Sequence, residues 1–458
     1  MTKPIYRIPL MREIAALPKT GLTVVSTFSG CGGSCLGYRM AGYKVVWANE
    51  FIPEAQRTYR ANHPETHLDD SDIRNVTVEQ IRRVIGAVDV DIFDGSPPCA
   101  SFSTAGKTSK GWGQVRKYSD TTQRTDDLFA QYIRILTDLK PKAFIAENVA
   151  GMVKGVSKGH FLRYLKMFEA LPYRVEARLI DAQYLGVPQR RNRLIFQGVR
   201  KDVGKPVWPM PLAYRYSVRD AIPWIAERSF VHEDNHGDPG DRLRSADVEP
   251  RGAIRANPSA TDRQHLLEPL VVHDTGRGEG PRDITNEPCP TITVGSDHID
   301  GGGARQHFKV LVQDGSFPAK FESAEGPSPT IVASRSTEYR YVEPESALAN
   351  AVGGEWDKLK PGEQSQKYMS LILPTEDAPC PTVTALGGTS AASVAHPYER
   401  RKFTIEELRR ICGFPDDFVL TGTYAQQWER LGRAVAPPVM AAIAGALRDK
   451  VFLKGSGI

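Results

Sequence analysis

One cysteine stands on a turn that is suited to nucleophilic chemistry. The apolar run over 88–93 is typical of a short buried strand, and it is followed by the turn Asp94-Gly95-Ser96-Pro97-Pro98-Cys99. The two prolines fix their φ angles near about −65° and remove two N–H donors, so Cys99 is expected on a stiff platform. Ligands of open α/β sheets bind at the ends of the strands. Cys99 is therefore a candidate nucleophile, although a buried structural cysteine fits this stretch alone equally well.

Further side chains suited to acid–base and anion chemistry follow other apolar stretches. A predicted buried strand over 142–149 carries Glu147 and Asn148 at its end, and residues 189–193, Gln-Arg-Arg-Asn-Arg, lead into an apolar strand over 194–199. A carboxyl group at such an edge can hold or donate a proton, and guanidinium groups bind anions. A strand-end salt bridge for Glu147 and a solvated edge for the arginines are the alternatives.

A glycine-rich loop lies between the first predicted strand, over 23–28, and a predicted helix. We call residues 28–33, Phe-Ser-Gly-Cys-Gly-Gly, the glycine loop. Such a loop lets the backbone approach a ligand at a helix N-terminus. Glu50 ends the next predicted strand 20 residues after Gly30, a spacing at which an acid can bind ribose hydroxyls. Asp72 follows a short predicted strand, where it could reach an adenine amino group. The pattern favours an adenosine-containing ligand, with a plain βαβ turn as the alternative.

The composition is that of a soluble globular protein. The chain has 458 residues, a net charge of +5, 40% hydrophobic and 25% charged residues, which predicts two or three domains. No run of about 18 apolar residues occurs, and residues 1–20 lack the apolar region of a secretory signal. The six cysteines include no C-x-x-C pair, so neither a disulfide framework nor a metal site is expected. A reducing cytoplasm fits this pattern, and the mild positive charge permits nucleic-acid binding without requiring it.

Strands and helices alternate as far as residue 200, which predicts an α/β fold with a mostly parallel sheet. The remaining predicted helices cover 53–62, 127–136 and 160–170, and the remaining strands cover 44–50 and 173–180. The polar segment over 100–124 has no clear period. We expect it to act as a lid, with a solvated insertion as the alternative.

Between 200 and 400 the helical period fades, and a Pro-x-Pro-Thr unit recurs over 287–293, 325–332 and 377–384. These units predict turn-plus-strand modules in an irregular β-rich domain. Helical patterns return after 400. Thr404 and Glu407 form a predicted capping box, and a final helix is predicted to open at residues 432–438 and to end near 447.

Together these stretches resemble the DNA cytosine-5 methyltransferase family, whose main motifs they carry in family order over about 1–200 and 400–458. Residues 28–33 resemble the cofactor loop, 97–99 and 147–149 the two catalytic motifs, and 189–193 the arginine motif; 413–415 and 432–435 resemble the C-terminal motifs. The resemblance implies a Rossmann-like S-adenosylmethionine-dependent methyltransferase domain over 20–200 plus 400–458. It also implies a β-rich target-recognition domain over 201–399.

The activity implied by the resemblance is methyl transfer from S-adenosylmethionine to C5 of a flipped cytosine in a specific double-stranded DNA sequence, through a covalent Cys99–C6 adduct. Glu147 would donate a proton or hydrogen bond to N3, Arg193 would bind O2, and Arg191 would help to position Cys99, which follows Pro98, and the base. The residues expected to bind the cofactor are Phe28, Gly30, Gly32, Gly33, Glu50, Phe51, Asp72, Ile73, Leu128, Arg433, Ala434 and Val435. No metal is expected.

Three positions depart from the family pattern. Ser26 stands where an acid is frequent at the end of the first strand, Ala100 where glutamine is common after the cysteine, and Arg433 where asparagine is usual. Arg433 has two interpretations. Its side chain turns outward or to a local carboxylate, or it binds the carboxylate of a carboxylated S-adenosylmethionine and makes the enzyme a carboxymethyltransferase.

The expected partner is double-stranded DNA, with a cognate restriction endonuclease or, for an orphan or phage enzyme, none. We expect a cytoplasmic, nucleoid-associated monomer without membrane contact. A tRNA-directed relative is a second hypothesis, against which the length of 201–399 argues. A catalytically silent DNA-binding protein is a third, against which the presence of Cys99, Glu147 and Arg193 argues.

Overall fold

The computed structural model describes residues 3–98, 116–118, 121–123, 127–154, 158–226, 330–333, 339–348 and 350–454. The chain divides into two compact units, residues 1–226 with 345–458 and residues 227–344. The seven-stranded sheet and all α-helices of the described residues belong to the first unit. The assignment of 201–399 to target recognition stays a prediction.

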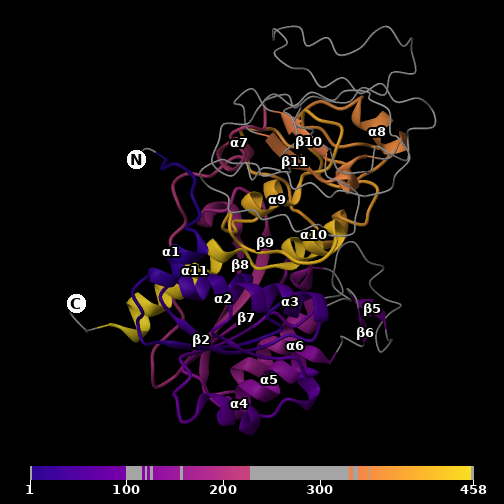
Figure 1. Cartoon of the computed structure of the whole chain (residues 1–458). Helices are drawn as coiled ribbons and strands as arrows, with labels where there is room; N and C mark the ends of the chain where they lie inside the picture. The colour runs from indigo at the N-terminus through magenta and orange to yellow at the C-terminus, as the bar shows by residue number, and fades with distance from the viewer. Residues whose placement is uncertain are drawn as a thin grey trace, which may run out of the picture. The chain divides into compact units, whose positions relative to one another are not determined.

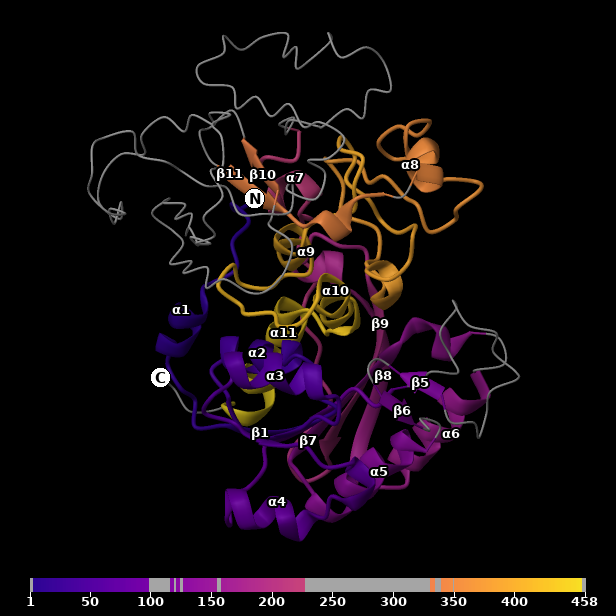
Figure 2. The same cartoon turned by 45° about the vertical axis from the view of Figure 1, so that its right-hand side comes forward.

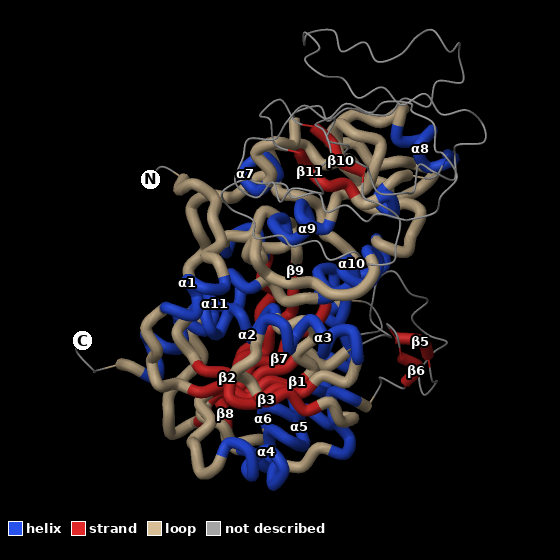
Figure 3. The backbone as a smooth tube through the Cα atoms, viewed as in Figure 1, coloured by secondary structure: helices blue, strands red, loops and turns tan. Residues whose placement is uncertain are grey.

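A mixed seven-stranded sheet forms the centre of the first unit (Figure 3). The strand order is β3-β2-β1-β4-β7-β9-β8, in which β3, β2, β1, β4 and β7 run parallel and β9 runs antiparallel to both β7 and β8. The strands are β1 (Thr23–Thr27), β2 (Lys44–Asn49), β3 (His67–Asp69), β4 (Ile92–Gly95), β7 (Ala143–Val149), β8 (Tyr173–Asp181) and β9 (Asn192–Arg200). The predicted α/β fold is confirmed.

Helices cover both faces of this sheet, and each face has its own apolar core (Figures 1 and 2). On one face lie α2 (Gly33–Met40), α3 (Pro53–Asn62) and α11 (Pro437–Leu447). On the other lie α4 (Val78–Ile85), α5 (Leu128–Leu139) and α6 (Lys158–Glu169). Buried β1 contributes alternately to the two cores, with Val24 on the first face and Val25 on the second.

The other described elements are short. They are α1 (Met11–Ala16), β5 (Arg116–Tyr118), β6 (Thr121–Gln123), α7 (Val218–Ala221), β10 (Thr330–Ala333), β11 (Tyr339–Val342), α8 (Asn350–Trp356), α9 (Ile405–Ile411) and α10 (Tyr424–Arg433). The strands β5 and β6 pair antiparallel inside the polar segment 100–124, for which no strand was expected. Its role as a lid stays a prediction.

Two features of the C-terminal helices test the sequence patterns. The capping box of α9 is confirmed, because Thr404 Oγ1 accepts a hydrogen bond from Glu407 N at 3.2 Å and Glu407 Oε2 accepts one from Thr404 N at 2.8 Å. The final helix begins at Pro437 rather than near Gly432, which lies in the last turn of the unpredicted helix α10. Two prolines at its start favour this boundary, because their missing N–H groups are not needed in a first turn.

The Pro-x-Pro-Thr unit over 377–384 is not a strand, which corrects the expected turn-plus-strand module at this copy. Asp377 lies in a turn and Ala378 in a bend, and Cys380 is the one bridge residue of the unit, paired in parallel with Gln189. Pro379 and Pro381 flank Cys380 and have no N–H to donate, so a ladder cannot extend in either direction. The copy over 287–293 lies outside the described residues, and Thr330 of the copy over 325–332 begins β10.

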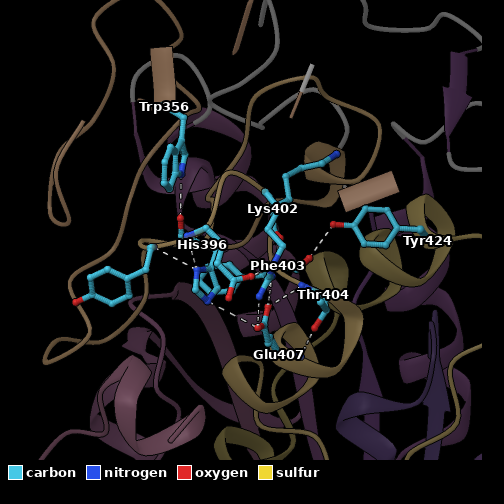
Figure 4. A network of polar contacts seen from close by, with 10 residues as sticks. Trp356, His396, Lys402, Phe403, Thr404, Glu407 and Tyr424 are labelled. Carbon is cyan, nitrogen blue, oxygen red and sulfur yellow. Dashed lines mark hydrogen bonds and ion pairs between the residues drawn. The ribbon is translucent and has the colours of Figure 1, made fainter. Parts of the chain in front are cut away.

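A buried polar network holds the segment before α9 (Figure 4). Arg401 donates to both carboxylate oxygens of Glu407, at 2.8 Å each, and His396 Nδ1 accepts from Glu399 N at 3.0 Å. Arg401 holds the pKa of Glu407 at about 2 against the opposing effect of burial. Lys402 Nζ donates to Gly388 O at 3.1 Å. These contacts fix the chain that leads from the 377–384 unit to the C-terminal motifs.

Candidate active site

The sheet topology brings the predicted chemical groups to one edge. The strands β1, β4 and β7 run parallel, so the glycine loop, the turn over 96–99 and Glu147 all follow at their carboxyl ends. The strand β9 runs antiparallel, so Arg193 near its start reaches the same edge, with Cα opposite Val149. We call residues 96–99 the nucleophile turn; Cys99 itself lies outside the described residues.

The backbone of the glycine loop requires the residues found there. Phe28, Gly30 and Gly32 all have positive φ, of 52°, 58° and 89°. A Cβ atom on Gly32 would lie 2.2 Å from His63 Nε2, and one on Gly33 would lie 2.3 Å from Val435 O. The loop is therefore packed from both sides, and only glycine fits where α2 begins. The strained φ of Phe28, a non-glycine residue, marks the loop as a functional segment.

Glu50 supports the glycine loop directly. Its Oε2 accepts a hydrogen bond from Gly30 N and its Oε1 one from Ile52 N, each at 2.7 Å. The side chain is buried, and burial raises the pKa of Glu50 while the two backbone donors lower it. Phe51, the next residue, is partly exposed. The structure thus brings the glycine loop, Glu50 and the adjacent Phe51 of the predicted cofactor site together. Ribose binding by Glu50 stays a prediction.

An arginine joins the predicted adenine-binding residues to α5. Arg74 donates to Asp72 Oδ2 at 2.8 Å and, through two nitrogens, to both carboxylate oxygens of Asp127 at 2.9 and 2.7 Å. Asp127 directly precedes buried Leu128, and Ile73 lies between Asp72 and Arg74. Bidentate pairing of this kind fixes geometry as well as charge. The sequence interpretation assigned no role to Arg74, because its bidentate partner Asp127 lies 53 residues further along the chain and only the fold brings the two together.

The C-terminal motif over 432–435 reaches the same site from the other side. The carbonyl of Val435 is the atom that a Cβ on Gly33 would meet, and a Cβ there would also lie 3.3 Å from the Ala434 side chain. Arg433 Nε donates to Glu429 Oε1 at 2.7 Å, one turn earlier on α10. The local carboxylate that one interpretation of Arg433 required is therefore present.

Two of the predicted catalytic side chains, Glu147 and Arg193, contact each other. Arg193 Nε lies 2.8 Å from Glu147 Oε1, and the side chains are only 16% and 9% exposed. Burial lowers the pKa of Arg193, and Glu147 opposes that effect. The salt bridge considered for Glu147 exists, and its partner is the other candidate catalytic group. A carboxyl and a guanidinium group thus face one position at the sheet edge.

Asn148 ties this pair to the nucleophile turn. Its Nδ2 donates to Pro97 O at 3.1 Å, and the side chain is buried. The bond connects the end of β7 to the residue two positions before Cys99. Pro98, the last described residue of the turn, is partly buried. Asn148 was noticed only as a neighbour of Glu147, and its contact depends on β4 and β7 being adjacent, which no local pattern indicates.

Arg191 contacts the C-terminal motif. Its guanidinium donates to Gly432 O at 2.6 Å, Val383 O at 2.9 Å and Ala434 O at 3.2 Å. Burial lowers the pKa of Arg191 to about 9. Its Nε has no hydrogen-bond partner among the described residues. Arg191 thus holds the 377–384 unit and the motif at 432–435 together, and its expected contact with Cys99 stays a prediction.

Replacing Arg191 with lysine is expected to lower the free energy of unfolding by about 2 kcal/mol, because a compact ammonium cannot span three carbonyls that the planar guanidinium reaches. Urea denaturation measures this change. The matched control is Arg190→Lys, since Arg190 is exposed, for which we expect a change within about 0.5 kcal/mol. Equal stabilities of the two variants would contradict the bridging role.

The described residues contain neither a candidate metal-binding group nor a membrane-spanning helix. None of their His, Cys, Asp and Glu side chains form a group of three that could hold a metal ion. Among the helices of the described ranges, none is long and apolar enough to cross a membrane.

Comparison with known proteins gives a family match over most of the chain. The family model of C-5 cytosine-specific DNA methylases matches residues 22–255 and 298–449. The Type II methyltransferase M.AgeI of Thalassovita gelatinovora is 26% identical over 454 residues, which cover 93% of this chain and 99% of M.AgeI. M.NgoPII of Neisseria gonorrhoeae is 38% identical over 182 residues, 40% of this chain. The chain spans about half the length of M.NgoPII, 49%, and of M1.HphI of Haemophilus parahaemolyticus, 52%.

A solved structure shares the fold. It is a prophage-encoded E. coli protein described as a candidate DNA modification methyltransferase, and it matches with a TM-score of 0.57 at 21% identity. The match covers 93% of this chain and 99% of that one.

Proposed function

The chain belongs to the family of C-5 cytosine-specific DNA methylases, and from this premise we propose that it transfers a methyl group from S-adenosylmethionine to C5 of a cytosine in double-stranded DNA. The observation that carries the proposal is the buried Glu147–Arg193 pair at the sheet edge where the nucleophile turn follows β4. A cytosine needs an acid at N3 and a cation at O2 on one side of the ring, and this pair offers both groups.

The proposed reaction divides one difficult step into easier ones. The thiolate of Cys99 adds to C6, and negative charge develops on N3 and O2. Glu147 donates a proton or hydrogen bond to N3, and Arg193 donates a hydrogen bond to O2. C5 becomes enamine-like and nucleophilic. Once C5 carries the new methyl group, loss of its proton and elimination of the Cys99 thiolate restore the aromatic ring.

The residues around the glycine loop fit the methyl donor. S-adenosylmethionine, when bound, supplies an electrophilic methyl group on a sulfonium. The loop backbone leaves no room for side chains at Gly32 and Gly33, and its fixed conformation permits close approach of a ligand. Glu50 would hold the ribose hydroxyls, and Asp72 and Ile73 would hold the adenine. The contacts expected of Phe28, Phe51, Leu128, Ala434 and Val435 belong to the same proposal.

The ordinary donor is favoured over a carboxylated one. Glu429 Oε1 already accepts a hydrogen bond from Arg433 Nε at 2.7 Å, so a donor carboxylate would have to compete with a carboxylate from the same helix. We infer that Arg433 serves this local pair. Transfer of a carboxymethyl group would require the pair to open, and mass spectrometry of DNA modified in the presence of both donors distinguishes the two products.

We propose that the target cytosine is flipped out of the duplex, because C6 cannot be reached within the base stack. In this proposal residues 201–399 read the sequence and the polar segment 100–124 closes over the base. A restriction endonuclease as partner, an orphan or phage role, and the cytoplasmic location also remain proposals, for which the Type II names of the relatives are the support.

The test is covalent trapping. Unmethylated genomic DNA is incubated with the protein and tritiated S-adenosylmethionine, and the product nucleosides are identified by mass spectrometry; DNA made with 5-fluorocytosine is used in parallel. We expect 5-methylcytosine in the first sample and an adduct stable in detergent in the second. Methylation of tRNA but not DNA would favour the tRNA-directed alternative. DNA binding without either product would favour the catalytically silent one.

A further inference from the structure

A buried aspartate lies between the glycine loop and the nucleophile turn. Asp94 is the third residue of β4 and is 1% exposed. Its Cα is paired with that of Ser26 on the parallel strand β1, at the end where the glycine loop begins. Paired positions on adjacent strands place their side chains on the same face of the sheet. An acid at this edge is therefore present, but on β4 rather than on β1, where Ser26 stands.

The carboxylate of Asp94 collects hydroxyl groups from the segments that shape the glycine loop. Its Oδ2 accepts hydrogen bonds from Ser26 Oγ and Ser34 Oγ, each at 2.9 Å, and its Oδ1 accepts one from Tyr38 OH at 3.0 Å. Ser34 and Tyr38 lie one turn apart on α2, Ser34 in its first turn. Ser29 of the loop continues the network, with its Oγ 3.1 Å from Ser26 Oγ. Four hydroxyl groups are thus ordered around one buried carboxylate.

Contacts of both neighbours of Asp94, Phe93 and Gly95, fix the position of β4. Tyr132 OH donates to Phe93 O at 3.1 Å, and a Cβ on Gly95 would lie 2.5 Å from Thr27 Oγ1. Burial raises the pKa of Asp94 to about 6, and the hydroxyl donors lower it. A buried carboxyl group is costly unless hydrogen bonds satisfy it, and the hydroxyl groups of Ser26, Ser34 and Tyr38 do so. The next four residues of the chain are Gly95, which ends β4, and Ser96, Pro97 and Pro98, which precede Cys99.

We propose that Asp94 is a positioning residue that couples the glycine loop to the nucleophile turn, holding the loop and the start of α2 in the conformation that binds S-adenosylmethionine. This inference rests on the proposed function. In this proposal Asp94 contacts no substrate and acts through Ser26, Ser34 and Tyr38. We expect the side chains of Asp94 and Ser26 to be exchangeable, because their Cα atoms are paired on adjacent strands and Ser26 Oγ donates directly to Asp94.

Exchanging the two side chains tests the proposal. Asp94→Ser removes the carboxylate and is expected to weaken S-adenosylmethionine binding by about tenfold or more, the scale of lost charge-assisted hydrogen bonds. Ser26→Asp places two carboxylates at paired positions, and like charges there also disturb the loop. The double variant Ser26→Asp/Asp94→Ser restores one carboxylate and is expected to bind within about threefold of the wild type. Calorimetry without DNA measures the Kd.

The matched control is Asp91→Asn. Asp91 is also buried and directly precedes β4, but at the other end of that strand, where it accepts from Thr23 N at 2.7 Å and pairs with Lys142. Its loss is expected to lower Tm and leave the Kd for S-adenosylmethionine unchanged, whereas Asp94→Ser changes both. The isosteric Asp94→Asn supplies a second variant with little change in volume, for which we expect a raised KM for S-adenosylmethionine.

The outcomes separate this inference from the proposed function. A double variant that binds no better than the weaker single variant would overturn the inference, as would Asp94→Ser or Asp94→Asn with wild-type affinity. In either case a wild-type protein that methylates DNA leaves the proposed function standing. Wild-type protein that fails to bind S-adenosylmethionine would overturn both.

Discussion

Replacing Cys99 with serine is expected to abolish the covalent adduct with 5-fluorocytosine DNA and to reduce methylation by about 10⁴-fold or more, the scale seen when a covalent nucleophile is removed. A serine hydroxyl is a far weaker nucleophile than a thiolate at neutral pH and has no adjacent base assigned to it here. The measurements are the fraction of labelled DNA that migrates with the protein in a denaturing gel and the single-turnover rate of methylation.

The control for Cys99 is chosen from the sequence. Cys289 also follows a proline, in the Pro-x-Pro-Thr unit over 287–293. Cys289→Ser is expected to trap and methylate DNA like the wild type. An adduct formed by Cys99→Ser, or lost in Cys289→Ser alone, would show that the nucleophile had been assigned to the wrong residue. Retained S-adenosylmethionine binding by Cys99→Ser would show that the variant is folded.

Glu147→Gln is expected to lower the single-turnover rate of methylation by about 10²–10⁴-fold, the usual contribution of a positioned acid or base. The amide keeps the volume of the carboxyl group but can neither protonate N3 nor neutralise Arg193, which is 2.8 Å away and 16% exposed. Because addition of Cys99 builds up negative charge on the base, we also expect trapping on 5-fluorocytosine DNA to become slow.

Asp202→Asn is the matched control for Glu147→Gln. Asp202 also pairs with an arginine of β9, Arg200, at 2.8 Å, but its side chain is 65% exposed and lies beyond the other end of that strand. Surface pairs of this kind contribute little, so rate and Tm should both stay at the wild-type values. A Glu147→Gln enzyme with a wild-type rate would remove Glu147 from the proposed mechanism, whatever its Tm.

The elements that the sequence predicted are those with a strong local signal. Short apolar runs marked β1, β2 and β7, and Thr404 with Glu407 marked the start of α9. The glycine loop and Glu50 were also visible locally, since a spacing of 20 residues connects them. The helix α4 was overlooked, although Val78, Ile81 and Ile85 recur at helical spacing and Thr77 with Gln80 forms a capping box at its start.

The contacts that complete the site depend on the order of the strands. Ser26 meets Asp94 because β4 lies beside β1, and Asn148 meets Pro97 because β7 lies beside β4. Neither neighbour follows in sequence, and no periodicity encodes it. Arg191 likewise reaches carbonyls at 383 and 432, far from it in the chain. Residue types therefore predicted which groups react, and the tertiary fold was needed to find which residues hold them.

The close packing of α2 against α11 has a consequence for how the protein is made. A Cβ on Gly37 would lie 2.6 Å from both Met440 Cβ and Pro437 O, and Tyr43 OH donates to Ala444 O, 401 residues further along the chain. While the ribosome is still translating, α2 has no partner for this apolar face. Such long-range contacts slow folding and expose nascent chains to aggregation. We therefore expect α2 to reach its native packing only after α11 has emerged from the ribosome.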